Sequence, residues 1–118
     1  DTPLSPVRQR IGRWFKRAEG ERFAAYLPDA EFSAAEAGHA GLVITDRRLV
    51  YKKAAALREY PLDRAGHVEI RRRGRYASVH ITQPGQRPAT LCVDPVLLNR
   101  LTDQLQGLQT PWSVSKAL

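Results

Sequence analysis

Residues 41–53 read GLVITDRRLVYKK, and this stretch decides the fold because two apolar runs flank a short polar turn. Both runs are rich in β-branched and aromatic residues, which is typical of strands. Four more runs of similar length follow up to residue 93, so that the full series is GLVIT, RLVYKK, LREYPL, HVEIRR, YASVHIT and RPATLCV. Their short connections predict an antiparallel meander, and we expect one further strand between residues 21 and 40.

The first hairpin has a register that the apolar residues predict. With the turn placed directly after Asp46, Ile44 faces Leu49. Leu42 then faces Tyr51, so four large apolar side chains share one face, and a slip by one residue would break both pairs. We also expect the Asp46 carboxylate to accept N–H groups of the turn.

The run HVEIRRRGRYASVHIT, residues 67–82, predicts a second hairpin. We place its turn at Arg73 and Gly74, because Gly adopts the positive φ that a tight hairpin turn requires. The expected cross-strand pairs are Ile70 with Ala77, Val68 with Val79, and His67 with His80.

Helices are predicted near both ends of the chain. Residues 4–18 place apolar side chains at three- and four-residue spacing with cations between them, which is typical of an amphipathic helix. Asp94 is a good N-cap and Pro95 suits the first turn of a second helix. The apolar stripe of this second helix, which we expect to be buried on the strands, is Leu98, Leu101, Leu105 and Leu108. Residues 109–118 are expected to form a tail in which Trp112 docks.

The composition is that of one ordinary domain. The chain has 118 residues, of which 42% are hydrophobic and 26% charged. No apolar run approaches the roughly 18 residues of a membrane-spanning helix, and Cys92 is the only cysteine. These features argue against transmembrane helices, a disulfide scaffold and a disordered chain. Since the chain starts at Asp1 and contains no Met, we expect an excised domain or a processed product. The lone cysteine fits a reducing, cytoplasmic setting, which includes the inner face of the membrane.

The formal net charge of +7 is unevenly distributed. Residues 1–18 carry +4, residues 19–46 carry −5 and residues 47–90 carry +8, while the remainder is neutral. Fifteen of the 19 cations are Arg, whose planar guanidinium suits phosphate and carboxylate groups. The charge therefore predicts anionic partners, and by itself it says nothing about the fold.

The hairpin GLVITDRRLVYKK, the strand REYPL, the strand HVEI and the leucine-striped helix together resemble the bacterial PH-like domains, which are related to the pleckstrin-homology and GRAM groups. The residues that carry the resemblance are Ile44, Thr45, Asp46, Arg48, Leu49, Tyr51, Pro61 and Leu62. It implies a mainly β fold with two antiparallel sheets, arranged as a meander or partly open barrel of about seven strands and capped by a C-terminal helix. We accordingly divide the chain into a basic N-terminal helix or linker over 1–20, a PH-like domain over 21–108, and a tail over 109–118.

The resemblance implies a noncatalytic binding or scaffolding module of a larger protein. Phosphoinositide-binding PH domains carry Lys and Arg in the loop between their first two strands. The corresponding segment here, LPDAEFSAAEAGHA at residues 27–40, has no Lys or Arg and three acidic residues, so that site is not implied. Related domains also form oligomers, which leaves self-association open.

Two sets of residues are the candidate contacts with a partner protein or an anionic lipid surface. The expected anion-binding set is Arg71, Arg73, Arg75, Tyr76, Arg47 and Lys52. The expected membrane- or partner-binding helix contributes Arg10, Arg13, Trp14, Phe15 and Arg17. For the first set, the alternative is a solvated turn, or a turn that pairs with the acidic segment at residues 19–46. For the second, the apolar stripe packs on the domain or on a neighbouring segment of the full protein.

Other functions have weaker support in the sequence. A basic nucleic-acid-binding module is the alternative, although only Tyr76 accompanies the basic strands where a stacking surface needs several aromatic residues. His67, His80 and Glu69 could share a metal ion in the expected register, but an ordinary exposed pair is the simpler interpretation, so we assign no metal and no cofactor. No catalytic motif or small-molecule substrate site is recognised. Cys92 is expected to be buried and inert.

Overall fold

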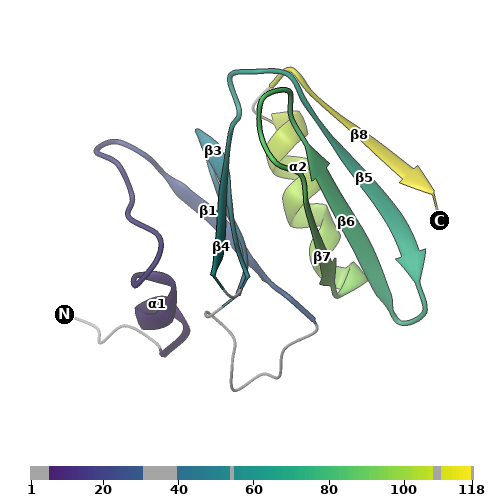
Figure 1. Cartoon of the computed structure of the whole chain (residues 1–118), viewed down its shortest axis with the longest axis horizontal. Coiled ribbons are helices and arrows are strands. Elements are labelled where there is room, and N and C mark those ends of the chain that lie inside the picture. The colour runs from purple at the N-terminus through teal and green to yellow at the C-terminus, as the bar shows by residue number, and fades with distance from the viewer. Residues whose placement is uncertain (1–5, 31–39, 54, 108–109, 118) are drawn as a thin grey trace.

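Two four-stranded sheets form the body of the protein in the computed structural model, which describes residues 6–30, 40–53, 55–107 and 110–117 (Figure 1). The first sheet has the order β1-β2-β3-β4, with β1 at Phe23–Pro28, β2 at Gly41–Thr45, β3 at Arg48–Lys53 and β4 at Ala56–Pro61. The second has the order β7-β6-β5-β8, with β5 at Gly66–Arg73, β6 at Tyr76–Thr82, β7 at Ala89–Val93 and β8 at Trp112–Ala117. The predicted mainly β class is confirmed, and the strands of the described residues form two open sheets with no closed barrel.

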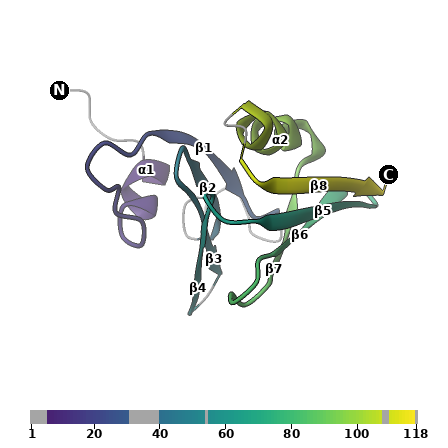
Figure 2. The ribbon, with the colours of Figure 1, turned by 90° about the horizontal axis from the view of Figure 1, so that it is seen from above.

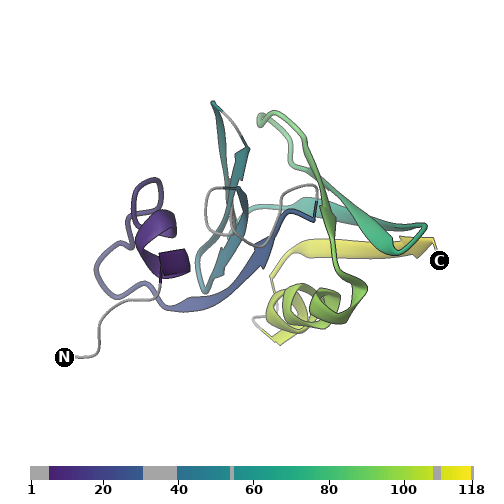
Figure 3. The ribbon, with the colours of Figure 1, turned by 90° about the horizontal axis from the view of Figure 1, so that it is seen from below.

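The helices lie outside the sheets. The short helix α1 spans Pro6–Ile11, and a 3-10 turn at Pro95–Leu97 leads into α2 at Leu98–Gly107. Figures 2 and 3 show the strands of the two sheets running in different directions, with α2 packed beside the second sheet. None of the helices in the described ranges combines the length and the apolar character that crossing a bilayer requires.

The first hairpin has the predicted register. Leu42 pairs with Tyr51 and Ile44 pairs with Leu49, and all four side chains belong to the main core. The predicted role of Asp46 is wrong, because the hydroxyl of Thr45 accepts the turn N–H groups of residues 47 and 48, each at 3.0 Å. A hydroxyl at the start of a turn reaches the N–H groups two and three residues later, which leaves the Asp46 carboxylate available to another segment.

The predicted register of the second hairpin is wrong. Its turn lies at Gly74 and the following residue, with a φ of 63° at Gly74, and Arg73 pairs with Tyr76. Ile70 therefore faces Val79, and His67 faces Thr82 instead of His80. The predicted and observed partners differ by two residues, which preserves the face of every side chain, so the apolar pattern cannot distinguish the two registers.

The expectation of a tail over 109–118 is also wrong, because β8 pairs in parallel with β5. The predicted docking of Trp112 is confirmed. The residue is 8% exposed, its ring lies edge-to-face with that of Tyr60 at a centroid distance of 6.4 Å, and its Nε1 donates to the carbonyl of Pro61 at 3.3 Å. The burial of this ring attaches the C-terminal strand to the core between the sheets.

The helix predicted over 4–18 is shorter in the structure. Residues 4 and 5 lie outside the described residues, and α1 ends at Ile11, directly before Gly12. Gly is a poor helix former, and the chain continues as tight turns in which the N–H groups of Trp14 and Phe15 both donate to the carbonyl of Ile11. The apolar stripe packs on the domain, which was one of the alternatives.

The start of the C-terminal helix agrees with its prediction. The Asp94 carboxylate accepts the N–H of Val96 at 3.0 Å, and Pro95 follows as the first residue of the 3-10 turn. The leucines of α2 at positions 98, 101 and 105 are buried in the main core, whereas Leu108 lies outside the described residues. Cys92 is half-buried, contrary to expectation, because strand alternation places the residues on either side of it in the core.

Candidate functional site

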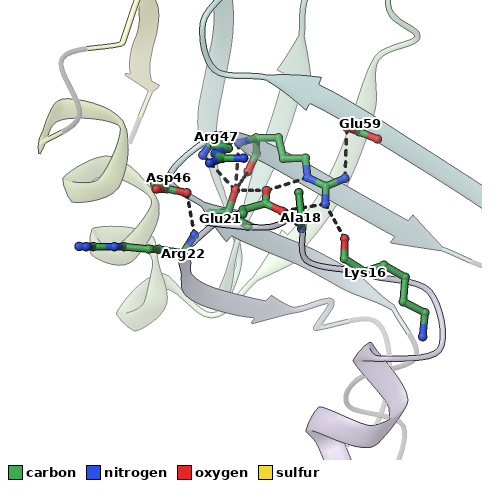
Figure 4. Close-up of polar contacts among 9 residues, drawn as sticks. Lys16, Ala18, Glu21, Arg22, Asp46, Arg47 and Glu59 are labelled. Carbon is green, nitrogen blue, oxygen red and sulfur yellow. Dashed lines mark hydrogen bonds and ion pairs between the residues drawn. The ribbon is translucent and has the colours of Figure 1, made fainter.

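A buried carboxylate fixes the segment that precedes β1. Glu21 is 2% exposed and accepts four hydrogen bonds, which Figure 4 shows. They come from the N–H of Ala18 at 2.9 Å, the hydroxyl of Thr45 at 2.8 Å, and Nε and Nη2 of Arg48 at 2.8 and 2.9 Å. These bonds, with that of Arg48 contributing most, lower the pKa of Glu21 from 4.5 to about 2.

Arg48 joins three parts of the chain through one guanidinium. Besides its two bonds to Glu21, it donates to the carbonyl of Lys16 at 2.8 Å and lies 3.2 Å from a carboxylate oxygen of Glu59 on β4. The guanidinium also lies over the ring of Phe15, 5.1 Å from its centroid. Hydrogen bonding to Glu21 is the main cause that raises the pKa of Arg48, so the pair is fully ionised at neutral pH. The network therefore holds the N-terminal segment on the first sheet.

Apolar contacts reinforce this attachment. Ile11 and Phe15 are buried against Val43 and Val50, which form the outer face of the first sheet. Phe15 also meets Phe23 edge-to-face, with ring centroids 6.4 Å apart. This small second core explains why the apolar stripe of the N-terminal segment is covered by its own domain.

A groove of about 710 Å³ lies between this segment and the beginning of β1. We call it the arginine groove, and its lining residues are Arg8, Ile11, Gly12, Phe15, Arg17, Arg22 and Phe23. Phe23 is 43% exposed, and Arg17 and Arg22 are exposed as well, so cations and an aromatic ring lie together at the surface. A basic rim over an apolar floor is suited to a ligand that is both anionic and apolar.

The predicted N-terminal contact residues are distributed differently in the structure. Phe15 and Arg17 line the arginine groove, whereas Trp14 packs against the second core. Arg13 is exposed and Arg10 is half-buried, and neither lines the groove. Sequence reasoning did not identify Arg22 and Phe23 as site residues, and their only signal was a cation beside an aromatic residue in the segment ERF.

The second basic surface is the tip of the β5–β6 hairpin. We call it the arginine hairpin, and it consists of Arg71, Arg72, Arg73, Arg75 and Tyr76, all of them exposed. Arg73 faces Tyr76 across the ladder, and Tyr76 is 43% exposed. Arg71 forms an ion pair with Glu69, which reduces the contribution of Arg71 to the positive surface. Arg72 lies on the opposite face, where it lines a small depression together with Lys116.

The two remaining members of the expected anion-binding set lie elsewhere. Arg47 is exposed in the β2–β3 turn, and Lys52 is half-buried in β3. Both belong to the first sheet, whereas the arginine hairpin is the tip of the second. The fold thus divides the six predicted residues between two sheets.

The two histidines of the second sheet make ordinary polar contacts. His67 lies 2.6 and 3.1 Å from the hydroxyls of Ser113 and Ser115 on β8, and His80 lies 2.6 Å from the hydroxyl of Thr90. The observed register of β5 and β6 places Thr82 opposite His67 and Glu69 opposite His80, so the two histidines are not direct cross-strand neighbours. Within the described ranges, no group of three His, Cys, Asp or Glu residues is arranged to hold a metal ion.

Comparison with known proteins gives no relative. No family model, no curated protein and no solved structure matches the chain. The resemblance to bacterial PH-like domains therefore stays a prediction, and the two basic surfaces are the features that bear on function.

Proposed function

We propose that this chain is a noncatalytic binding module that attaches a larger protein to an anionic membrane surface, at the inner face of the membrane. The observation that carries the proposal is the arginine hairpin, where four Arg and the half-exposed ring of Tyr76 occupy the tip of one hairpin. Each Lys or Arg near an anionic lipid surface contributes about 1 kcal/mol of attraction. A Tyr ring favours the interface between headgroups and hydrocarbon, because one end of it is polar and the rest is apolar.

The placement of the basic N-terminal segment relative to the arginine hairpin supports the same proposal. In Figure 1, α1 and the turn between β5 and β6 both lie toward the lower edge, and Figure 3, seen from below, shows them at opposite ends of the molecule. Residues 1–18 carry +4, and residues 71–76 at the β5–β6 turn also carry +4. A broad flat surface can meet both regions together, whereas a compact soluble ligand can meet only one.

Nucleic acid and an acidic protein are the competing partners. A surface that binds single strands stacks bases on several exposed aromatic rings. Among the described residues of the arginine hairpin, Tyr76 is the single aromatic side chain, so the observations favour lipid headgroups. The competing partners are outcomes of the test.

The test is co-sedimentation with vesicles of phosphatidylcholine that contain phosphatidylglycerol, compared with vesicles of pure phosphatidylcholine. We expect the protein to bind the first and to be absent from the second. The double variant Arg73→Glu with Arg75→Glu loses two cations at the tip, which predicts binding weaker by a factor of about 30 or more. Both residues are exposed, so folding is expected to be retained.

The matched control reverses two exposed cations elsewhere, by Arg64→Glu with Arg100→Glu, and gives the same net charge. We expect this control to retain most of the vesicle binding. Equal weakening in both double variants would mean that net charge alone is responsible, and would contradict a role for the arginine hairpin. Tighter binding to random-sequence DNA or RNA in a gel shift would favour the nucleic-acid alternative, and binding to neither would leave a protein partner.

A further inference from the structure

We propose that the arginine groove binds a single-chain amphiphile with an anionic head, a carboxylate or a phosphate, attached to a hydrocarbon tail. The groove lies on the first sheet and shares no residue with the arginine hairpin. This inference therefore goes beyond surface attachment by the arginine hairpin, and amphiphile binding and vesicle binding are measured separately.

The lining residues define the chemistry of the ligand. Three of them are Arg, and the other four are Ile11, Gly12, Phe15 and Phe23. None of the seven has a side chain that accepts hydrogen bonds, so a ligand has to supply acceptors and apolar surface. Guanidinium groups bind carboxylate and phosphate oxygens through paired hydrogen bonds, and the apolar floor suits a hydrocarbon chain.

The same lining disfavours a peptide. A peptide in extended conformation brings backbone N–H groups, which need acceptors when they are removed from water. The side chains of the groove offer donors alone. An amphiphile whose polar atoms are all at one end has no such requirement, and we therefore choose it over an acidic peptide.

The groove is large enough and rigid enough to be a binding site. Its volume of about 710 Å³ is within the range of roughly 300–1,000 Å³ that small-molecule sites occupy. The floor is fixed, because Ile11 and Phe15 are 6% and 8% exposed on the outer face of the first sheet. The Glu21–Arg48 pair and the bond from the N–H of Ala18 to Glu21 fix the backbone between Arg17 and Arg22, so little backbone ordering is left for the ligand to induce.

Two acidic side chains of the described residues, Glu21 and Asp46, lie in the segments that carry the groove and are engaged by donors outside it. The Glu21 carboxylate is saturated by four hydrogen bonds. The Asp46 carboxylate accepts the backbone N–H of Arg22 at 2.8 Å, which orients it toward the main chain. Neither residue lines the groove, so the lining itself has a formal charge of +3 from its three Arg.

The probes are dodecyl phosphate and dodecanoate, each titrated calorimetrically into the full chain below the concentration at which it aggregates. We expect saturable binding of one ligand per chain, with the phosphate and carboxylate arms distinguishing the two head groups. Inorganic phosphate and acetate test the head group alone, and dodecyl maltoside tests the tail alone. We expect each of these to bind at least tenfold more weakly, because each lacks one of the two halves.

Two variants test the residues. Arg17→Glu with Arg22→Glu is expected to weaken binding at least tenfold, and Phe23→Ala is expected to weaken it about fivefold by removing part of the apolar wall. The control Arg64→Glu with Arg100→Glu carries the same net charge and is expected to bind like the original protein. If the charge reversals near Glu21 disturb folding, Arg17→Gln with Arg22→Gln provides the same comparison without added negative charge.

Several results would overturn the proposal. They are unchanged affinity in both groove variants, an equal loss in the Arg64 and Arg100 control, and tighter binding of a short acidic peptide than of either amphiphile. Vesicle co-sedimentation is measured on the same samples. Absence of amphiphile binding together with intact vesicle binding would refute the groove alone, and the reverse result would refute the arginine hairpin alone.

Discussion

Replacing Glu21 by Gln tests the network that positions the N-terminal segment. The substitution keeps the size of the side chain and removes the negative charge beside Arg48. At neutral pH, breaking a buried ion pair costs about 3–5 kcal/mol, and we expect the lower end because Arg48 keeps Glu59 as a partner. The Glu21 side chain is 1% exposed and that of Arg48 is 19% exposed, so solvent screens this pair only weakly.

The pH dependence gives a sharper expectation. Folding lowers the pKa of Glu21 from 4.5 to about 2, so the ionised carboxylate stabilises the folded state above pH 4.5. This contribution is lost as the pH falls from 4.5 through 2, where the folded state also takes up the proton. It amounts to about 3 kcal/mol at pH 5, about 1 kcal/mol at pH 3 and less at pH 2.

The assay is urea unfolding at pH 7, 5, 3 and 2, followed by far-UV circular dichroism in the original chain and in Glu21→Gln. Other carboxylates titrate in both proteins, so they cancel in the difference between the two free energies of unfolding. We expect this difference to shrink by about 2 kcal/mol between pH 5 and pH 3. Glu19→Gln, an exposed neighbour, controls for the loss of one negative charge and is expected to change stability by less than about 0.5 kcal/mol. A difference that stays constant with pH would refute the assigned role of Glu21.

The remaining predictions concern packing and the alkaline limit of stability. An added Cβ at Gly66 would lie 2.5 Å from the ring of Trp112, so Gly66→Ala is expected to displace β8 and shift the tryptophan fluorescence to longer wavelength; an unchanged spectrum would contradict this packing. At Gly41 an added Cβ would lie 2.4 Å from a backbone oxygen of β1, whereas an added Cβ at Gly74 would enter open space. Urea unfolding should therefore show a loss of at least about 3 kcal/mol for Gly41→Ala and about 1 kcal/mol for Gly74→Ala. Equal losses would refute the close packing at Gly41. Burial raises the pKa of Tyr60 to about 12, so the stabilisation from its neutral hydroxyl group is present below pH 10 and is lost as the pH rises toward 12. Urea unfolding should show that Tyr60→Phe loses less stability over this alkaline range. The same dependence of stability on pH in both proteins would contradict this role of Tyr60.

The sequence was sufficient for features that follow from local alternation. A slip by one residue in the first hairpin would exchange the two faces of the strand and move Leu42 and Ile44 out of the main core, so burial excludes that slip. The second hairpin differs. Moving the start of its two-residue turn from Arg73 to Gly74 gives every residue a new cross-strand partner but leaves each side chain on the same face. Local pattern thus predicts which face is buried better than it predicts which residues are opposite.

Features that depend on distant contacts were outside the reach of sequence reasoning. The pairing of β8 with β5 begins with Gly66 opposite Trp112, and the short alternating run WSVSKA carries no signal for a parallel partner so far away in the chain. The arginine groove likewise depends on a distant contact. Glu21 binds Arg48, 27 residues away in the chain, and this contact holds the segment in which Arg17 and Arg22 line the groove together. Charge and aromatic content predicted the type of chemistry that we propose, and only the fold brought the residues of the groove together.

The most direct test of the proposed function is a vesicle-binding titration, in which the affinity for phosphatidylglycerol vesicles is compared between the Arg73→Glu, Arg75→Glu variant and the Arg64→Glu, Arg100→Glu variant. The two variants have the same net charge and differ in whether the tip of the β5–β6 hairpin keeps its cations. A surface-attachment module that uses the arginine hairpin predicts binding weaker by a factor of about 30 in the first variant and little change in the second. Equal affinities in the two variants would contradict it.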